Sequence, residues 1–275
     1  TMHGSFSEDG FLVIRNAIGN ELLGEIYLEI FNYLSGPAHS EASYAPDDIY
    51  ELFCKKATNL SVSEFEFQRP IWDWLSYKGL VEKLLKEPKL YDVFSSLMGK
   101  DLSYLDAPSL NLNLPSKDSP HKNYLFKDWH QEVWSGASIS NLQIWTPLLQ
   151  KDNFQGQIEL MHQSHKWGHI PHRNRVPTEL PEEFETLKTD LHSGDVIVFS
   201  TLMLHRSVAA NHPRLSLTAQ IRNFKRRSDS FQNENINWKI FSYSELTKIE
   251  RILGNHYLSP FRVVDVNTDY LSNDS

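Results

Sequence analysis

The most regular pattern in the chain is the stretch Arg214-Leu215-Ser216-Leu217-Thr218-Ala219-Gln220-Ile221-Arg222, in which polar and apolar residues alternate. Successive side chains of a β-strand point to opposite faces of its sheet, so this alternation predicts a strand with one polar and one apolar face. We expect the polar face to line the interior of a barrel and the apolar face to pack outward against helices.

Shorter patterns on the N-terminal side of this stretch predict further strands. Residues 110–114 and 142–146 alternate in the same way. Apolar runs at 11–14 and 196–204 predict buried strands, the second of them after the turn signal Ser193-Gly194-Asp195. The second half of the chain is therefore mainly β, and the number and shortness of its strands favour a jelly-roll barrel.

Helices are predicted on both sides of the β-rich region. Apolar side chains at helical spacing between residues 22 and 34 predict an amphipathic helix with Asn20 as its N-cap. Helical spacing returns from about 61 to 98, broken at Glu87-Pro88, and again over 244–253. We expect the N-terminal helices to pack against the outside of the barrel.

The length of 275 residues fits a single domain with additions, which we place over residues 1–275. Its predicted parts are an N-terminal strand and helical scaffold over about 5–100, a β-barrel core over about 101–226 and a C-terminal extension over 227–275. Aromatic residues within 65–74 could form a lid over a site, but packing between the helices is the simpler expectation.

Composition and charge narrow the class of protein. Hydrophobic residues make up 40% of the chain, which is enough for a core and excludes a disordered protein. The net charge of −8 gives no global support for binding nucleic acid or an anionic membrane. The single cysteine, Cys54, cannot form an internal disulfide, and no apolar run approaches the ~18 residues of a membrane span. With neither a signal region nor a peroxisomal address at its ends, a cytoplasmic protein is expected.

A candidate metal site begins with the segment Asp128-Trp129-His130-Gln131-Glu132. In an extended segment His130 and Glu132 project from the same face, because they are two residues apart. His205, at the end of the apolar run that starts at Val196, offers a third ligand. Two imidazoles and one carboxylate on one face of an octahedron, with the other positions open, are typical of non-haem Fe(II) oxygenases.

Arg214 follows His205 by nine residues and adds a second element to this site. A guanidinium forms bidentate pairs with carboxylates, and 2-oxoglutarate chelating an iron would present such a carboxylate at its far end. Histidine, carboxylate, histidine and arginine follow one another in this order along the chain. A binding site explains this order better than a chance occurrence of the four residues does.

A second histidine cluster competes with the first as a metal site, and it consists of His162, His165, His169 and His172. On one face of a helix these residues could bind zinc. However, Gly168 and Pro171 break a helix within this window. We therefore expect a loop with structural histidines.

Taken together, these motifs resemble the phytanoyl-CoA dioxygenase family of iron(II)- and 2-oxoglutarate-dependent oxygenases, from Glu8 to about Phe224. The resemblance is carried by residues 8–15, 128–132, 156–168, 205–207 and 214–216. It implies a cupin-like double-stranded β-helix and the use of Fe(II), 2-oxoglutarate and O2. It also implies a residue set: His130, Glu132 and His205 on iron, Arg214 and Ser207 on the far carboxylate of 2-oxoglutarate, Trp145 beside it, and Asn111 and Asn113 facing the same pocket.

The chain departs from the family pattern at two points. The family usually has Asp where this chain has Glu132, and the added methylene lengthens the arm by ~1.5 Å. Other iron- and 2-oxoglutarate-dependent oxygenases use Glu, so Glu132 is retained as a ligand. The interval from His205 to Arg214 is also short, which a tighter turn would accommodate.

The expected reaction is hydroxylation of an unactivated C–H bond in a small metabolite, with formation of succinate and CO2. Desaturation or ring closure would use the same chemistry. Two further alternatives stay open: a cupin-like isomerase or hydrolase that does not use 2-oxoglutarate, and a barrel that binds a ligand without catalysis.

Overall fold

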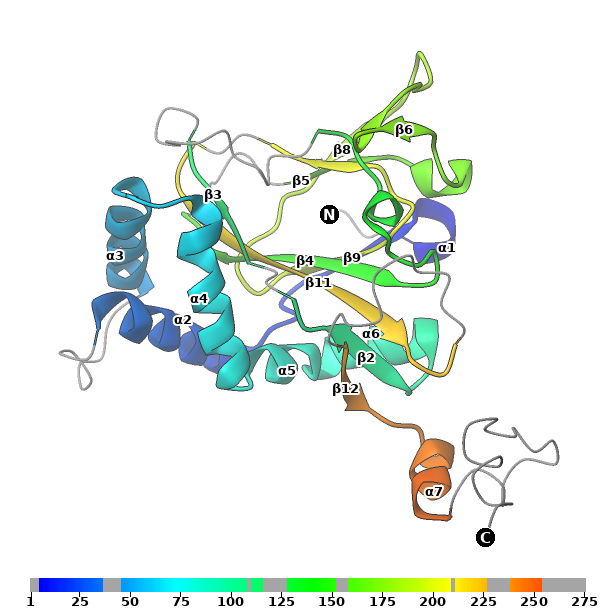
Figure 1. Ribbon diagram of the computed structural model, residues 1–275, viewed down its shortest axis with the longest axis horizontal. Helices are drawn as coiled ribbons and strands as arrows, with labels where there is room; N and C mark the ends of the chain where they lie inside the picture. Colours follow the sequence, from blue (N-terminus) through cyan, green and yellow to red (C-terminus); the bar gives the residue numbers. More distant parts are fainter. Residues whose placement is uncertain are drawn as a thin grey trace, which may run out of the picture.

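Two antiparallel sheets face each other and form the walls of a jelly roll (Figure 1). The computed structural model describes residues 5–36, 46–107, 110–115, 128–151, 158–208, 211–226 and 238–253. The large sheet has the order β1 (Phe11–Ile14), β9 (Val196–Ser200), β4 (Leu142–Leu149), β11 (Arg214–Asn223), β2 (Leu102–Leu105) and β12 (Trp238–Ser242), with β3 (Leu110–Asn113) also paired to β11. The small sheet has the order β10 (His205–Ser207), β5 (Ile158–Met161) and β8 (Thr186–Lys188). A separate hairpin joins β6 (His172–Arg173) and β7 (Val176–Pro177).

Helices cover the face of the large sheet that points away from the small sheet, and they are α2 (Asn20–Ser35), α3 (Pro46–Thr58), α4 (Glu64–Tyr77), α5 (Leu80–Leu85) and α6 (Pro88–Met98) (Figure 1). The short helix α1 (Phe6–Asp9) precedes β1, and α7 (Glu245–Leu253) lies apart from the sheets after β12. Two 3-10 turns are η1 (Glu132–Ser135) and η2 (Ser164–Trp167). In the described residues, no helix is both long and apolar enough to cross a membrane.

The core between the helices and the large sheet confirms the alternation predicted for β11. Leu215, Leu217, Ala219 and Ile221 are buried in one apolar cluster with residues of α2 to α6. The polar residues between them face the other way, toward the small sheet. The predicted jelly roll, mainly β with helices outside it, is therefore confirmed. One face of β11 packs against the helices, and its other face points to the space between the two sheets.

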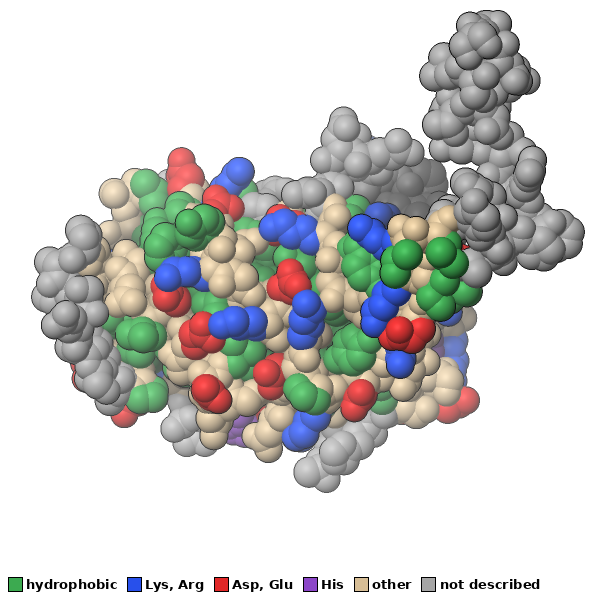
Figure 2. All heavy atoms as spheres, turned by 90° about the horizontal axis from the view of Figure 1, so that it is seen from below, with side chains coloured by type: hydrophobic (Ala, Val, Ile, Leu, Met, Phe, Trp, Pro, Cys, Tyr) green, Lys and Arg blue, Asp and Glu red, His purple; other side chains and the backbone are tan. Residues whose placement is uncertain are grey.

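The two tryptophans of α4, Trp72 and Trp74, pack between the helices. Trp72 is buried in the same apolar core, and the indole N–H of Trp74 donates a hydrogen bond to Glu29 at 2.8 Å. On the lower face of the molecule, basic and acidic side chains lie interspersed over the described surface (Figure 2). The pairs Lys83 with Glu25 and Lys86 with Glu82, each 2.6 Å apart, join neighbouring charges of α2 and α5 in this way.

Two predicted boundaries are wrong. The strand predicted over 196–204 ends at Ser200, where the chain turns and crosses to the small sheet, so that His205 begins β10. Ser200 and Thr201 interrupt the apolar run at this corner, but both are largely buried, and apolar residues continue on either side of them. Asn20 is the first residue of α2 rather than its N-cap; Gly19 holds the cap position, and its backbone N–H donates to Glu87 at 2.9 Å.

Strands from outside the predicted barrel core of 101–226 also join the large sheet. Strand β1 pairs with β9, with Phe11 opposite Phe199, and β12 pairs with β2, with Trp238 opposite Leu105. The sheet thus draws strands from the predicted scaffold and from the predicted C-terminal extension. The division of the chain into these parts stays a prediction.

Asp195 fixes the corner between β1 and the entry to β9. Its buried carboxylate accepts hydrogen bonds from the backbone N–H groups of Asn16 at 2.8 Å and His192 at 3.0 Å, and from the Arg15 guanidinium at 2.7 Å. Burial on its own raises the pKa of Asp195, but these three donors outweigh it and hold that pKa below its usual value. The charged form of Asp195 therefore stabilises the fold.

Candidate active site

A pocket between the two sheets collects the polar side chains of the inner faces. The pocket is partly open to solvent. The described residues that line it are Asn111, Leu112, Asn113, His130, Glu132, Gln143, Trp145, Ile158, Phe199, His205, Ser207, Arg214, Ser216 and Thr218.

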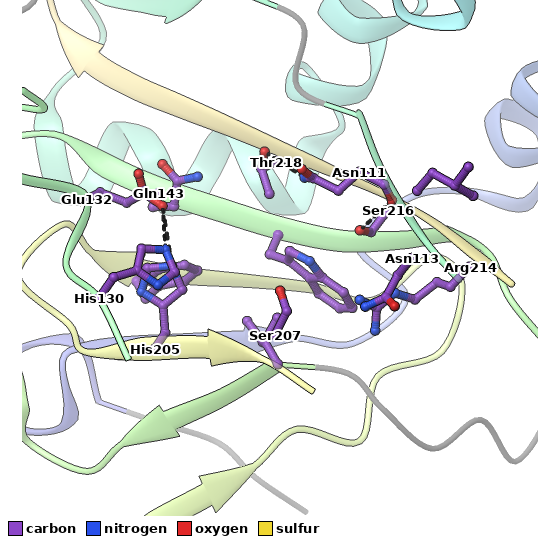
Figure 3. A pocket seen from close by; sticks show the side chains of 14 residues that line it. Asn111, Asn113, His130, Glu132, Gln143, His205, Ser207, Arg214, Ser216 and Thr218 are labelled. Carbon is purple, nitrogen blue, oxygen red and sulfur yellow. Dashed lines mark hydrogen bonds and ion pairs between the residues drawn. The ribbon is translucent and has the colours of Figure 1, made fainter. Parts of the chain in front are cut away.

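Three potential metal ligands meet at one end of this pocket (Figure 3). His130, Glu132 and His205 each offer one ligand atom, and these atoms lie within 4.8 Å of one another. An oxygen of Glu132 lies 3.3 Å from Nε2 of His205 and 3.6 Å from Nε2 of His130. The longer glutamate arm therefore reaches the space between the two imidazoles.

Hydrogen bonds fix the orientation of both imidazoles. Nδ1 of His130 lies 2.8 Å from the carbonyl oxygen of Asp128, and Nδ1 of His205 lies 3.0 Å from that of Met203. A carbonyl oxygen only accepts hydrogen bonds, so each Nδ1 carries a proton and Nε2 of each ring is the nitrogen that points to the site. This is the ring orientation that metal-binding histidines require.

The backbone ties the two histidines together although they are far apart in the sequence. The N–H of His130 donates to the carbonyl of His205 at 3.0 Å, and the N–H of His205 donates back at 3.1 Å. His130 thus lies in an extended bridge, and Gln131 keeps an extended backbone before η1 begins at Glu132. The prediction that His130 and Glu132 project from one face of an extended segment is confirmed for this short part of the chain.

Gln131 holds this segment in place from the opposite side. Its side chain is fully buried, its amide nitrogen donates to the carbonyls of Gly168 at 2.8 Å and Leu202 at 2.7 Å, and its amide oxygen accepts from the N–H of Ile170 at 3.0 Å. Gln131 lies between His130 and Glu132 in the sequence, so these three bonds restrain both of them.

Arg206 links the strands that carry the two histidines. Its guanidinium contacts the Glu159 carboxylate at 2.8 Å and lies 4.5 Å from the centre of the Trp129 ring. Trp129 directly precedes His130, and Arg206 directly follows His205. The contact between Arg206 and Trp129 therefore links the two segments through side chains, next to the backbone hydrogen bonds between His130 and His205.

Arg214 lies at the other end of the pocket and is almost completely buried. Its guanidinium lies 5.1 Å from the centre of the Trp145 ring. Burial lowers the pKa of Arg214 to about 9, so the side chain remains protonated at neutral pH. A carboxylate bound beside it would offset the cost of burying this charge.

The structure brings all eight residues of the predicted site to this one pocket. Besides the three potential metal ligands and Arg214, the pocket contains Ser207, Trp145, Asn111 and Asn113. The amide nitrogen of Asn111 donates to the Thr218 hydroxyl at 3.2 Å. The inward direction predicted for the two asparagines is thus observed.

The competing histidine cluster forms no comparable site. Among the described residues, the only cluster of three or more His, Cys, Asp or Glu side chains close enough together to bind a metal is the one at the pocket. His162 instead lies between two carboxylates, 3.2 Å from Asp9 and 2.9 Å from Glu185. His165 lies in η2, and His172 begins β6.

Sequence reasoning did not single out Gln143 and Phe199, which also line the pocket. Gln143 lies two residues before Trp145 on β4, so the alternation places both side chains on one face of the sheet. The signal that could have found Gln143 was this spacing. Phe199 lies within a continuous apolar run, which gives no such signal.

Comparison with known proteins gives a family and a fold. The model of the phytanoyl-CoA dioxygenase (PhyH) family matches residues 6–215. The chain is 26% identical over 205 residues to the dioxygenase olcK of Penicillium canescens, covering 72% of this chain and 61% of that protein, so it spans about three fifths of this relative's length.

Among solved structures, the chain is similar to the non-haem monooxygenase ThoJ, with a TM-score of 0.53, 18% identity and coverage of 87% of this chain and 83% of that one. It is also similar to the α-ketoglutarate-dependent epimerase SnoN from nogalamycin biosynthesis, with a TM-score of 0.51, 14% identity and coverage of 86% and 96%. At these identities the likeness establishes the fold.

Proposed function

Because the chain belongs to the phytanoyl-CoA dioxygenase family, we propose that it is an Fe(II)- and 2-oxoglutarate-dependent oxygenase that hydroxylates an unactivated C–H bond of a small metabolite. In the balanced reaction, the substrate, O2 and 2-oxoglutarate give the hydroxylated substrate, succinate and CO2. The related dioxygenase is consistent with oxidation, and the related epimerase shows that this fold also serves other outcomes.

One observation carries the proposal: a single pocket holds a two-histidine, one-carboxylate group at one end and a buried arginine at the other. The donor set fits Fe(II), because both imidazoles direct Nε2 to the site while Glu132 supplies the carboxylate. The proposed ligands are therefore His130, Glu132 and His205.

When bound, iron and 2-oxoglutarate together supply the activation of O2. Arg214 would pair with the far carboxylate of 2-oxoglutarate through its two-pronged guanidinium, and Ser207 would add a hydrogen bond. Trp145 packs against the guanidinium and Phe199 against the ring of His205, with ring centres 4.8 Å apart. These aromatic walls orient both groups and exclude water.

The decisive experiment is an anaerobic titration of the protein with Fe(II) and 2-oxoglutarate. The weak visible charge-transfer band of the chelate should develop, and succinate formation should follow on adding O2. His130→Ala and His205→Ala should abolish both. Arg214→Lys should keep iron binding but weaken 2-oxoglutarate binding by about 10- to 100-fold, because a charged bidentate hydrogen bond is lost.

The same titration separates the proposal from its alternatives. A protein that binds iron without developing the band would be a metal enzyme that does not use 2-oxoglutarate. A protein that binds neither would be a non-catalytic barrel. Full turnover in His130→Ala or His205→Ala would contradict the assignment of the metal ligands.

A further inference from the structure

The metal end of the pocket carries a buried amide that the reaction scheme above leaves unused. The Gln143 side chain lines the pocket beside Glu132 and is only 5% exposed. Its Oε1 atom is buried and has no hydrogen-bond partner among the described residues. A buried polar atom without a partner costs about 1–3 kcal/mol, so Gln143 is suited to a partner that arrives with a ligand.

The position of Gln143 separates it from the proposed 2-oxoglutarate anchor. Trp145 lies beside the Arg214 guanidinium, and Gln143 lies two residues before Trp145, about 7 Å along β4. Figure 3 shows Arg214, Asn113 and Ser216 at one end of the pocket and Gln143 with the histidines at the other. A 2-oxoglutarate molecule held by Arg214 would therefore leave the Gln143 amide facing the space next to the metal ligands.

The charges of the pocket walls limit what can occupy that space. Of the described residues that line the pocket, the ionisable ones are the three proposed metal ligands and Arg214. Once these are engaged by iron and 2-oxoglutarate, the other described lining residues offer amides, hydroxyls and apolar surface. A charged group buried against these residues would find no counter-ion among them, and burying an unpaired charge is costly.

We infer that Gln143 is a specificity-determining residue that binds an uncharged hydroxyl or amide group of the substrate, next to the carbon that reacts. This inference rests on the proposed oxygenase function and narrows it. The part of the substrate that enters the pocket is neutral and polar, in contrast to a carboxylate, a phosphate or an ammonium group.

Three probes of the same shape test the inference: benzamide, benzoate and benzamidinium, which are neutral, anionic and cationic. Their binding is measured by anaerobic calorimetry on protein saturated with Fe(II) and 2-oxoglutarate. We expect benzamide to bind at least tenfold more tightly than either charged probe. Gln143→Leu, which keeps the approximate size, should weaken benzamide binding by about tenfold, within the range of one lost hydrogen bond. Gln143→Glu should make benzamidinium the preferred probe.

The matched control is Gln220→Leu. Gln220 lies opposite Gln143 on β11 and is equally buried, but it already accepts a hydrogen bond from Asn141 at 3.5 Å and does not line the pocket. This variant should bind benzamide like the wild type, and melting temperatures check that all variants are folded.

The 2-oxoglutarate affinity, measured first on each variant, separates the two levels of the proposal. Failure of the wild type to bind 2-oxoglutarate would reject the oxygenase itself. Normal 2-oxoglutarate binding without a preference for benzamide, or with benzamide affinity unchanged in Gln143→Leu, would overturn the role of Gln143 alone. A large loss of iron affinity in Gln143→Leu would also overturn it, because the amide would then act on the metal ligands.

Discussion

Replacing Glu132 with Asp, the residue that the family usually has at this position, should damage the metal site of this chain. The Glu132 oxygen lies 3.3 and 3.6 Å from the two imidazole Nε2 atoms. If ligand bonds of about 2.1 Å, as for zinc, are taken as a guide, neighbouring ligands of an octahedral ion lie about 3 Å apart. The glutamate thus already sits slightly outside the ideal spacing.

Shortening the arm removes ~1.5 Å of reach. The oxygen would then lie up to about 5.1 Å from an imidazole nitrogen, beyond the ~4.2 Å that two ligands on opposite sides of one ion can span. The backbone cannot easily follow, because the N–H of residue 132 donates to the carbonyl of Thr201 at 3.0 Å and Gln131 is held by three hydrogen bonds. We expect Fe(II) affinity to fall by at least 10- to 100-fold, the loss typical for disturbing even an outer partner of a metal ligand.

The assay is anaerobic calorimetric titration of Fe(II) into Glu132→Asp in the presence of 2-oxoglutarate, followed by measurement of succinate formation. Glu64→Asp is the matched control, since Glu64 is also a buried glutamate but lies in α4 and does not line the pocket. Iron affinity and turnover of Glu132→Asp equal to those of the wild type would refute the reasoning from arm length.

Two further predictions concern stability. Gln131→Leu removes the hydrogen-bond partner of one buried and two half-buried backbone groups, so the free energy of unfolding in urea should fall by about 2–4 kcal/mol. The remaining folded protein should bind Fe(II) more weakly, and unchanged stability would contradict the restraint. Asp195→Asn should lose about 1–2 kcal/mol at pH 7, because three donors lower the pKa of this aspartate in the folded state. The charged carboxylate of Asp195 contributes its full stabilisation above about pH 3.9, the pKa of an aspartate in the unfolded chain. This stabilisation is lost as the pH falls through the lower pKa of Asp195 in the folded protein. The difference between wild type and variant should therefore close below about pH 4, and a constant difference across urea unfolding at pH 3 to 7 would argue against it.

The sequence predicts five strands of the large sheet, β1, β3, β4, β9 and β11, but not β2 and β12. The alternation is clearest where one face of a strand meets helices and the other meets the pocket. Strand β11 shows this most clearly, since leucines and polar residues alternate along its length. The alternation also indicates which residues share a face, as for Asn111 and Asn113. The prediction fails at residues 196–204, because it reads one strand across the polar pair Ser200-Thr201, where the chain turns from one sheet into the other.

The proposed metal ligands could be found from residue type and order, but the contacts that hold them could not. Gln131 and Arg206 act through partners on other elements, such as Ile170 and Glu159, and no spacing in the sequence reveals such pairs. Gln143 shares this difficulty, because its significance depends on the charges of the whole pocket wall. The pattern along one strand shows to which face a side chain points. The balance of charges around that side chain can be seen only when all the walls of the pocket are assembled.

The two histidines are held by the same pattern of hydrogen bonds, so Glu132 is the ligand whose reach has to match their positions. Each imidazole is bonded through Nδ1 to the carbonyl two residues before it, and the two backbones are bonded to each other in both directions. The nitrogen lone pairs are therefore positioned by the fold before any metal arrives, so their spacing is fixed. The carboxylate must meet a position that the histidines have already set, and the Glu132 oxygen lies 3.3 and 3.6 Å from their Nε2 atoms, so we expect the shorter arm of an aspartate on the same backbone to fall short of it.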